Sequence, residues 1–94
     1  MTESGLQQKI INFCKSSRIL CYKFASPAHR GVPDLMLLAH GRTLFIELKH
    51  PNGKGVVSEL QKVTHTKMRE AGATVIVGHD YEIITTFILQ FFDL

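Results

Sequence analysis

Apolar residues recur along the chain with two different periods, which together predict alternating helices and strands. Residues 2–17 carry apolar side chains at helical spacing, and Thr2 can cap the start of this helix. The inner face of the helix is predicted to carry Leu6, Ile10 and Phe13. Residues 19–25 instead alternate in side-chain type, which is typical of a strand.

Two short apolar runs, residues 34–39 and 43–49, are separated by His40-Gly41 and predict a β-hairpin. A two-residue turn at this point pairs Met36 with Phe45. A four-residue turn keeps the same side chains on the same face, whereas an odd-length loop needs a bulge to do so. The hairpin therefore predicts which side chains meet across the two strands.

Three charged side chains interrupt the apolar runs of this hairpin. The two-residue turn places Asp34 opposite Glu47, and directly opposed residues have Cβ atoms about 4.5–5.5 Å apart on one face. Lys49 lies two residues beyond Glu47 and therefore falls on that face as well. The pairing predicts that two acids and a lysine converge at the open end of the hairpin.

A helix, a strand and a final helix are predicted in the second half of the chain. Ser58 and Gln61 fit a capping box that opens a helix ending at Gly72. Residues 74–77 follow as a β-branched strand, in the order of a βαβ crossover, and Asp80 can cap the last helix. The apolar stripe of that helix is Ile84, Phe87, Ile88 and Phe91. The complete order αβββαβα predicts an α/β fold with a mixed sheet flanked by helices.

Length and composition indicate one globular domain over residues 1–94, with 45% hydrophobic and 20% charged residues. The net charge of +3 favours a polyanionic partner only mildly. Because so short a chain buries a modest core, support from a second copy is plausible. Cys14 and Cys21 are too few for a disulfide framework and fit a reducing compartment.

Neither a secretion signal nor a membrane span is predicted. The N-terminus has no basic segment followed by an apolar one, and the longest apolar runs are far shorter than a membrane-spanning helix. These observations predict a soluble, intracellular protein without a membrane partner.

The converging acids are the main candidates for chemistry. Each acid alone has a structural interpretation, because Asp34 can accept backbone hydrogen bonds and Glu47 can pair with Lys49. Together, with the main-chain carbonyl of Leu48, they suit a hard divalent cation such as Mg²⁺ or Mn²⁺. This combination predicts a metal-dependent phosphodiesterase, in which Lys49 orients the attacking water or neutralises charge on phosphorus.

Two further side chains are candidates for the same site. Gln61 can serve only as the partner of Ser58 in the capping box, or it can also contact a phosphate or a water in the site. Glu3 can act as a favourable acid in the first helical turn. It also lies on the apolar stripe of its helix, from which it can reach the metal or its water shell.

Basic residues near the site are candidates for DNA contacts. His29 and Arg30 precede the acids in a loop flanked by proline and glycine, where they can bind phosphate or remain solvated. Lys54 lies in a loop after the hairpin and can add attraction for a nucleic-acid backbone.

The motif Pro33-Asp34 followed by Glu47-Leu48-Lys49 resembles the PD-(D/E)xK signature of restriction-endonuclease-like nucleases. The wider series resembles the VRR-Nuc family, the virus-type replication-repair nucleases, in its minimal stand-alone viral form. That series comprises a first helix bearing Glu3, Gly31-Val32-Pro33-Asp34-Leu35, Ile46-Glu47-Leu48-Lys49 and Ser58-Glu59-Leu60-Gln61.

The resemblance implies a restriction-endonuclease-like core in which Asp34 and Glu47 bind the metal and Lys49 is catalytic. It implies that Gln61 is the helix glutamine near the site and that Glu3 completes the metal shell. It further implies a homodimer that cuts branched DNA, such as a four-way junction, in DNA repair. The location that it implies is the cytoplasm, and the host cytoplasm if the chain is viral.

Two other functions are compatible with the sequence. One is a non-catalytic module that binds nucleic acid, branched or duplex, on the same fold. The other is a small structural subunit that packs through Phe87 and Phe91. The intact set of two acids and a lysine favours the nuclease, because a dead site has no reason to keep buried charge.

Overall fold

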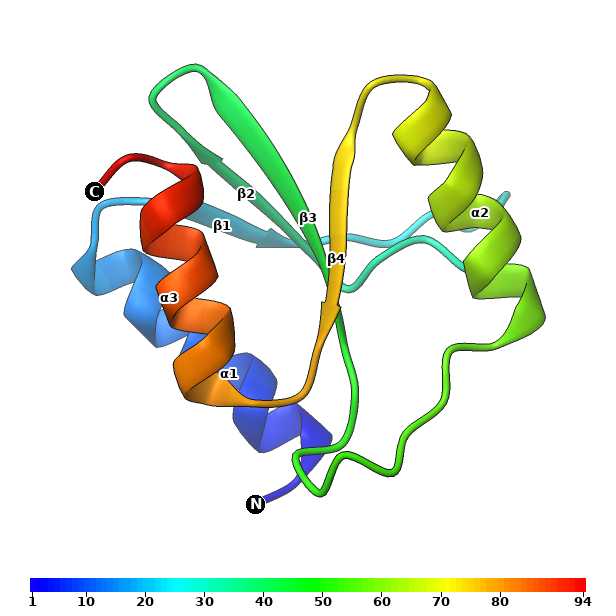
Figure 1. Ribbon diagram of the computed structural model, residues 1–94, viewed down its shortest axis with the longest axis horizontal. Helices are drawn as coiled ribbons and strands as arrows, with labels where there is room; N and C mark the ends of the chain where they lie inside the picture. The colour runs from blue at the N-terminus through cyan, green and yellow to red at the C-terminus, as the bar shows by residue number, and fades with distance from the viewer.

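The computed structural model describes residues 1–94 as a four-stranded mixed sheet covered by three helices (Figure 1). The elements, in chain order, are α1 (Glu3–Ser16), β1 (Leu20–Lys23), β2 (Leu35–Ala39), β3 (Arg42–Leu48), α2 (Glu59–Glu70), β4 (Thr74–Gly78) and α3 (Tyr81–Phe91). The predicted order αβββαβα and the mixed α/β fold are confirmed. The strand expected over residues 19–25 and the helix expected to reach Gly72 are both shorter than predicted.

The strands lie side by side in chain order, β1-β2-β3-β4. β1, β2 and β3 are antiparallel neighbours, whereas β4 runs parallel to β3 after the crossover through α2. The predicted two-residue turn is confirmed, because Ala39 pairs with Arg42 and Met36 pairs with Phe45. His40 and Gly41 both have positive φ, as hairpin turns that follow the strand twist require.

Local capping explains where the three helices begin. The side chain of Thr2 accepts a hydrogen bond from the Gly5 N–H, and that of Asp80 accepts one from the Ile83 N–H. The capping box predicted for α2 is present, with Ser58 and Gln61 bonding to each other's backbone N–H. All three caps expected from the sequence are therefore confirmed.

The hydrophobic core lies between one face of the sheet and the pair α1 and α3, which pack side by side (Figure 1). It comprises Leu6, Ile10, Cys14, Ile19, Leu35, Leu37, Leu44, Ile46, Leu48, Ile84, Ile88 and Phe92. The predicted inner position Phe13 is only partly buried, because Cys14 points more directly into the core. Phe92, just after the last helix, is wholly buried and was not predicted.

The helix α2 is separate from this core and packs beside β4, on the opposite face of the sheet (Figure 1). Leu48 and Ile46 face α1 and α3, so the intervening Glu47 points toward α2. The sheet thus carries an apolar core on one face and a polar cluster on the other. None of the three helices is long and apolar enough to cross a membrane.

Candidate active site

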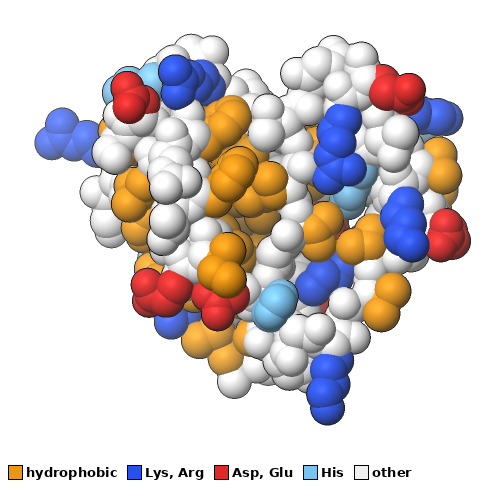
Figure 2. All heavy atoms as spheres, viewed as in Figure 1, with side chains coloured by type: hydrophobic (Ala, Val, Ile, Leu, Met, Phe, Trp, Pro, Cys, Tyr) orange, Lys and Arg blue, Asp and Glu red, His pale blue; other side chains and the backbone are white.

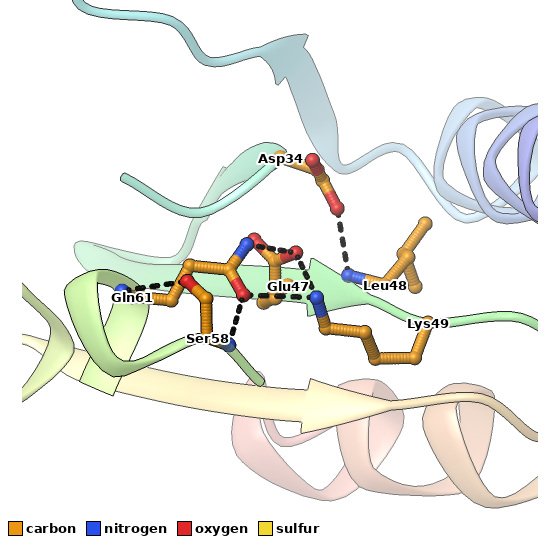
Figure 3. A network of polar contacts seen from close by, with 6 residues as sticks. All are labelled: Asp34, Glu47, Leu48, Lys49, Ser58 and Gln61. Atoms are coloured by element: carbon orange, nitrogen blue, oxygen red, sulfur yellow. Dashed lines mark hydrogen bonds and ion pairs between the residues drawn. The ribbon is translucent and has the colours of Figure 1, made fainter. Parts of the chain in front are cut away.

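The start of β2 and the end of β3 bring Asp34 and Glu47 together. The observed pairing ends at Leu35 with Ile46, and Asp34 precedes it in the same register. The Leu48 N–H donates a hydrogen bond to Asp34 Oδ2 at 2.8 Å (Figure 3). This bond anchors the Asp34 side chain against the strand that carries Glu47. Asp34 therefore accepts a backbone hydrogen bond, as its structural interpretation requires, and also lies beside Glu47.

Glu47 is the most deeply buried charged residue of the chain, with 2% of its surface exposed. Its Oε2 accepts a hydrogen bond from Gln61 Nε2 at 2.9 Å and lies 3.2 Å from Lys49 Nζ (Figure 3). Its other oxygen, Oε1, is buried and has no hydrogen-bond partner in the chain. A buried carboxylate oxygen without a partner is costly, so this oxygen is available to a bound cation or water.

The electrostatics of Glu47 agree with this geometry. Burial raises the pKa of its carboxyl above the ordinary value, and the negative charge of Asp34 raises it further. Hydrogen bonding and the positive charge of Lys49 oppose the rise, as does the hydrogen bond from Gln61. The two acids therefore repel each other in the folded chain, and a cation between them would relieve that repulsion.

Gln61 connects the helix to the acids. Its Oε1 accepts hydrogen bonds from Lys49 Nζ at 2.9 Å and from the Ser58 N–H at 3.0 Å, while its Nε2 donates to Glu47 (Figure 3). The capping role and the site role were alternatives at the level of sequence. One side chain performs both, because a capping box at the start of α2 points the amide toward the end of β3.

Lys49 completes this network of polar contacts. Its ammonium lies between Glu47 and Gln61, and only 14% of its side chain is exposed. Because Gly55 packs closely against the stem of Lys49, the loop after the hairpin helps to hold the lysine in place. A positive charge fixed beside two carboxylates can orient an anionic group brought to the acids.

Comparison with known proteins identifies relatives that share this fold. Two solved structures share the fold: a "VRR_NUC domain" with a TM-score of 0.81 and 24% identity, covering 92% of both chains, and a "VRR_NUC domain protein". The second has a TM-score of 0.83 and 20% identity, and the match covers 99% of this chain and 89% of that one. No protein-family model matches the chain.

A curated phage protein gives the closer match in sequence. It is described as "Putative nuclease p44" of Acyrthosiphon pisum secondary endosymbiont phage 1, and it is 33% identical over 76 residues that cover 80% of each chain. The chain belongs to the VRR-Nuc family. The resemblance inferred from the short motifs is therefore confirmed. The polar cluster around Asp34 and Glu47 lies in a VRR-Nuc chain.

The donor groups of this VRR-Nuc chain fit a hard divalent cation. Asp34 keeps one oxygen free of hydrogen bonds within the chain, and Glu47 Oε1 is the buried oxygen without a partner. The Leu48 carbonyl points to the same side of β3 as the Leu48 N–H that Asp34 binds, since both groups of one strand residue face the same neighbour. Two carboxylates, a carbonyl and water are the oxygen ligands that Mg²⁺ and Mn²⁺ take in proteins.

The structure does not bring Glu3 into this VRR-Nuc site as a third acid. Glu3 lies exposed in the first turn of α1, and the chain has no group of three or more acids, histidines or cysteines placed to share a metal. Two side-chain ligands, rather than three, are therefore ready in the folded chain. A contact between Glu3 and the metal or its water shell stays a prediction.

The predicted DNA-contacting residues are exposed around the site. His29 and Arg30 lie in the loop that leads to Asp34, and Lys54 lies in the loop between β3 and α2. Several basic side chains lie over α2 and the segment before it on the face drawn in Figure 2. Contact between any of these residues and DNA stays a prediction.

His65 is a residue near the site that sequence reasoning did not assign. It is 1% exposed and is the only buried residue of α2. Burial lowers the pKa of its imidazole first, and the charge of Arg69 lowers it next. Lys49 lowers that pKa as well, while the Gly31 backbone and Asp34 raise it. The one available indication in the sequence was its spacing of four residues from Gln61, which places both on one helix face.

Proposed function

We propose that this VRR-Nuc chain is a divalent-metal-dependent DNA endonuclease that hydrolyses phosphodiester bonds. The observation that carries the proposal is the buried, partnerless Oε1 of Glu47 beside Asp34. Purely structural acids would have both oxygens satisfied, because an unpaired buried oxygen destabilises the fold. Family membership and the phage relative described as a nuclease support the same activity.

Asp34, Glu47 and the Leu48 carbonyl would hold Mg²⁺ or Mn²⁺. When bound, the ion would supply Lewis-acid activation of the phosphate and of an attacking water. Lys49 would face the incoming phosphate and offset its growing negative charge. Gln61 would hold Glu47 and Lys49 in one orientation, because its amide bonds both side chains.

The substrate class within this proposal is branched DNA, cut by a homodimer. Support comes from the likeness of the chain to stand-alone viral VRR-Nuc proteins and from the small size of the domain. Ninety-four residues with a net charge of +3 offer one chain a modest surface for DNA. Two copies would double that surface and present two sites to a substrate with two-fold symmetry.

Cleavage of a labelled four-way junction, beside a linear duplex of the same sequence, tests the proposal. The assays contain Mg²⁺, Mn²⁺ or EDTA, and the control protein is Asp34→Ala. We expect cleavage with a metal ion that favours the junction, and loss of cleavage in EDTA and in the variant.

Other outcomes separate the parts of this proposal. Equal cleavage of junction and duplex would keep the nuclease and reject branch selectivity. Full activity of Asp34→Ala would reject the assigned site. Tight binding without cleavage under every condition would favour a non-catalytic nucleic-acid-binding module.

A further inference from the structure

The segment between β1 and β2 carries two of the predicted DNA-contacting residues, His29 and Arg30, and reaches α2 (Figure 1). Its two ends are joined, because the Phe24 N–H donates a hydrogen bond to the Asp34 carbonyl at 2.7 Å. Residues 25–33 form neither helix nor strand, so they make a loop that returns to the candidate site. The position of this loop therefore decides where its basic side chains lie relative to the acids.

Thr64 of α2 holds this loop against the helix. Its hydroxyl donates a hydrogen bond to the Arg30 carbonyl at 3.1 Å, although the two residues are 34 positions apart in the sequence. A Cβ atom built on Gly31 would lie 2.8 Å from Thr64 Oγ1 and 3.0 Å from the Leu60 carbonyl oxygen. Only glycine fits so close to the helix, and φ at this position is also positive at 86°. A hydrogen bond and close backbone packing thus place residues 30–31 on α2.

The same helix holds the acid Glu47. Gln61 donates a hydrogen bond to the Glu47 carboxylate at 2.9 Å, and Thr64 follows three residues later on α2. Because three residues of an α-helix span only about 4.5 Å, the Arg30 backbone and the Glu47 carboxylate are held by one rigid element. The chain on the other side of Arg30 is also confined, because Pro33 is wholly buried and has a fixed φ. The point from which the Arg30 side chain extends is therefore fixed relative to the acids.

The Arg30 side chain has the chemistry for a phosphate contact at this position. It is exposed, and it forms no ion pair with a carboxylate of the chain. A guanidinium without an acidic partner can bind a phosphate through two parallel hydrogen bonds. A backbone that is already fixed loses less conformational freedom when DNA binds, so the contact stabilises the complex more than the same arginine on a free loop would.

We propose that Thr64 is a positioning residue that fixes the Arg30 backbone on α2 and so presents the Arg30 guanidinium to a DNA phosphate beside the two acids. This inference rests on the proposed function, because it requires DNA to be brought to those acids. Thr64 itself contacts neither DNA nor metal in this proposal, and it acts through Arg30. Its hydroxyl, rather than its size, performs the role.

Four single substitutions on α2 test the role of the hydroxyl. Thr64→Val and Thr64→Ala both remove it, so the test does not depend on the folding of one variant. Thr64→Ser keeps the hydroxyl and should behave like the wild type. Thr66→Val makes the same chemical change at an exposed position of the same helix and serves as the matched control.

The first readout is the order of the loop backbone in the free protein, measured by NMR relaxation of the amide groups. We expect order parameters of about 0.85 for Arg30 and Gly31 in the wild type and below about 0.6 without the hydroxyl. Thr64→Ser and Thr66→Val should keep the wild-type values. Unchanged values in both Thr64→Val and Thr64→Ala would overturn the proposal, and an equal loss of order in Thr64→Ser would show that the hydroxyl is not the cause.

The second readout is junction binding, measured by fluorescence anisotropy in EDTA with and without Arg30→Gln. Loss of the hydroxyl should weaken binding about 5- to 30-fold, the factor that corresponds to ordering the backbone of one residue. Because Thr64 acts through Arg30, Thr64→Val should change the affinity of the Arg30→Gln protein by less than about 2-fold. Equal losses in the two backgrounds would assign Thr64 a general structural role and overturn the proposal. An Arg30→Gln protein that binds like the wild type would also overturn it.

The two proposals fail in distinguishable ways. If the wild type binds the junction and cleaves it with neither Mg²⁺ nor Mn²⁺, the proposed nuclease activity is wrong, and the binding comparison alone decides the role of Thr64. If the wild type cleaves DNA and loss of the hydroxyl leaves binding unchanged, the proposed function stands and the positioning role is wrong. A wild type that neither binds nor cleaves DNA would overturn both.

Discussion

At the scale of single residues, Glu47 is the charged side chain whose surroundings are least favourable to its charge. It is buried beside a second acid, and only one of its oxygens has partners, namely Lys49 and Gln61. Those two partners reduce the cost of ionising the carboxyl without removing it, because its pKa still lies above the ordinary value. Such a residue is tolerated where function requires it, since an apolar side chain at this position would avoid the cost of burying a carboxylate beside a second acid.

The raised pKa of Glu47 predicts how stability depends on pH without metal. Between the ordinary value of 4.5 and the higher pKa in the folded chain, the folded state binds more protons than the unfolded state. The contribution of Glu47 to the free energy of unfolding is therefore fully present below 4.5 and is lost as pH rises through the folded pKa. Urea denaturation across this pH range should show the loss in the wild type and not in Glu47→Gln.

A matched control and a metal titration sharpen this test. Glu59→Gln changes an exposed acid on α2 and should keep the pH dependence, because Glu47 is intact. Saturating Mg²⁺ should reduce the loss by offsetting the repulsion between Glu47 and Asp34. A Glu47→Gln variant with the same pH dependence as the wild type would show that another group causes it.

At the scale of elements, α2 supplies the contacts that organise the two acids of the hairpin into a site. It packs beside β4 on the face opposite the main core, and its one buried residue is polar. Its first turn bonds Glu47 and Lys49 through Gln61, and its second turn bonds the loop before Asp34. The helix therefore contributes more to the geometry of the site than to the hydrophobic core.

The two functions of Gln61 can be separated by comparing it with its capping partner. Ser58→Ala removes the hydrogen bond to the Gln61 N–H and should cost about 0.5–2 kcal/mol of stability, with little change in cleavage. Gln61→Leu removes the bonds to Glu47 and Lys49 as well and should lower kcat/KM further than its loss of stability explains. Denaturation curves and cleavage rates measured on both variants provide the comparison.

Equal behaviour of these two variants would contradict the site role of Gln61. If cleavage falls only in proportion to stability in both, then Gln61 acts solely as a helix cap. Gln61→Glu offers an intermediate case, because it keeps the oxygen that Lys49 and Ser58 bind while replacing the N–H donor to Glu47.

At the scale of the whole molecule, the residues that stabilise the fold and the residues of the candidate site lie on opposite faces of the sheet. The face of the sheet toward α1 and α3 buries the apolar core, and the opposite face carries the acids, the lysine and the exposed basic loops. Arg18 lies near the other end of the sheet, since β1 begins opposite Leu38, far along β2 from Asp34. Basic residues at the two ends should therefore differ in their effect on DNA.

Salt dependence of DNA binding tests this asymmetry. Each phosphate contact adds close to one to the slope of log affinity against log salt concentration. Arg30→Gln should therefore weaken junction binding and reduce the slope by about one, whereas Arg18→Gln should leave both unchanged. Fluorescence anisotropy with EDTA present measures binding without cleavage. Equal slopes for the wild type and Arg30→Gln would place the DNA away from the loop that precedes Asp34.

The sequence by itself determined the parts of this protein that depend on neighbours along the chain. Caps at Thr2, Ser58 and Asp80 and the turn at His40-Gly41 act over a few residues, so local chemistry specified the helix starts and the hairpin register. That register brought Asp34 and Glu47 to one end of the hairpin before any long-range contact was considered.

Only the tertiary structure decided how distant segments meet. Gln61 reaches Glu47 because α2 crosses back over the sheet to place β4 beside β3, and nothing local specifies the depth of that packing. For this reason His65 had no assigned role in the sequence, although it is the most buried residue of its helix. The same principle applies to Glu3, because its position on a helical stripe does not specify its distance from the acids. Helical periodicity specifies which face a residue shares, whereas the distance between elements is set by the packing of the whole chain.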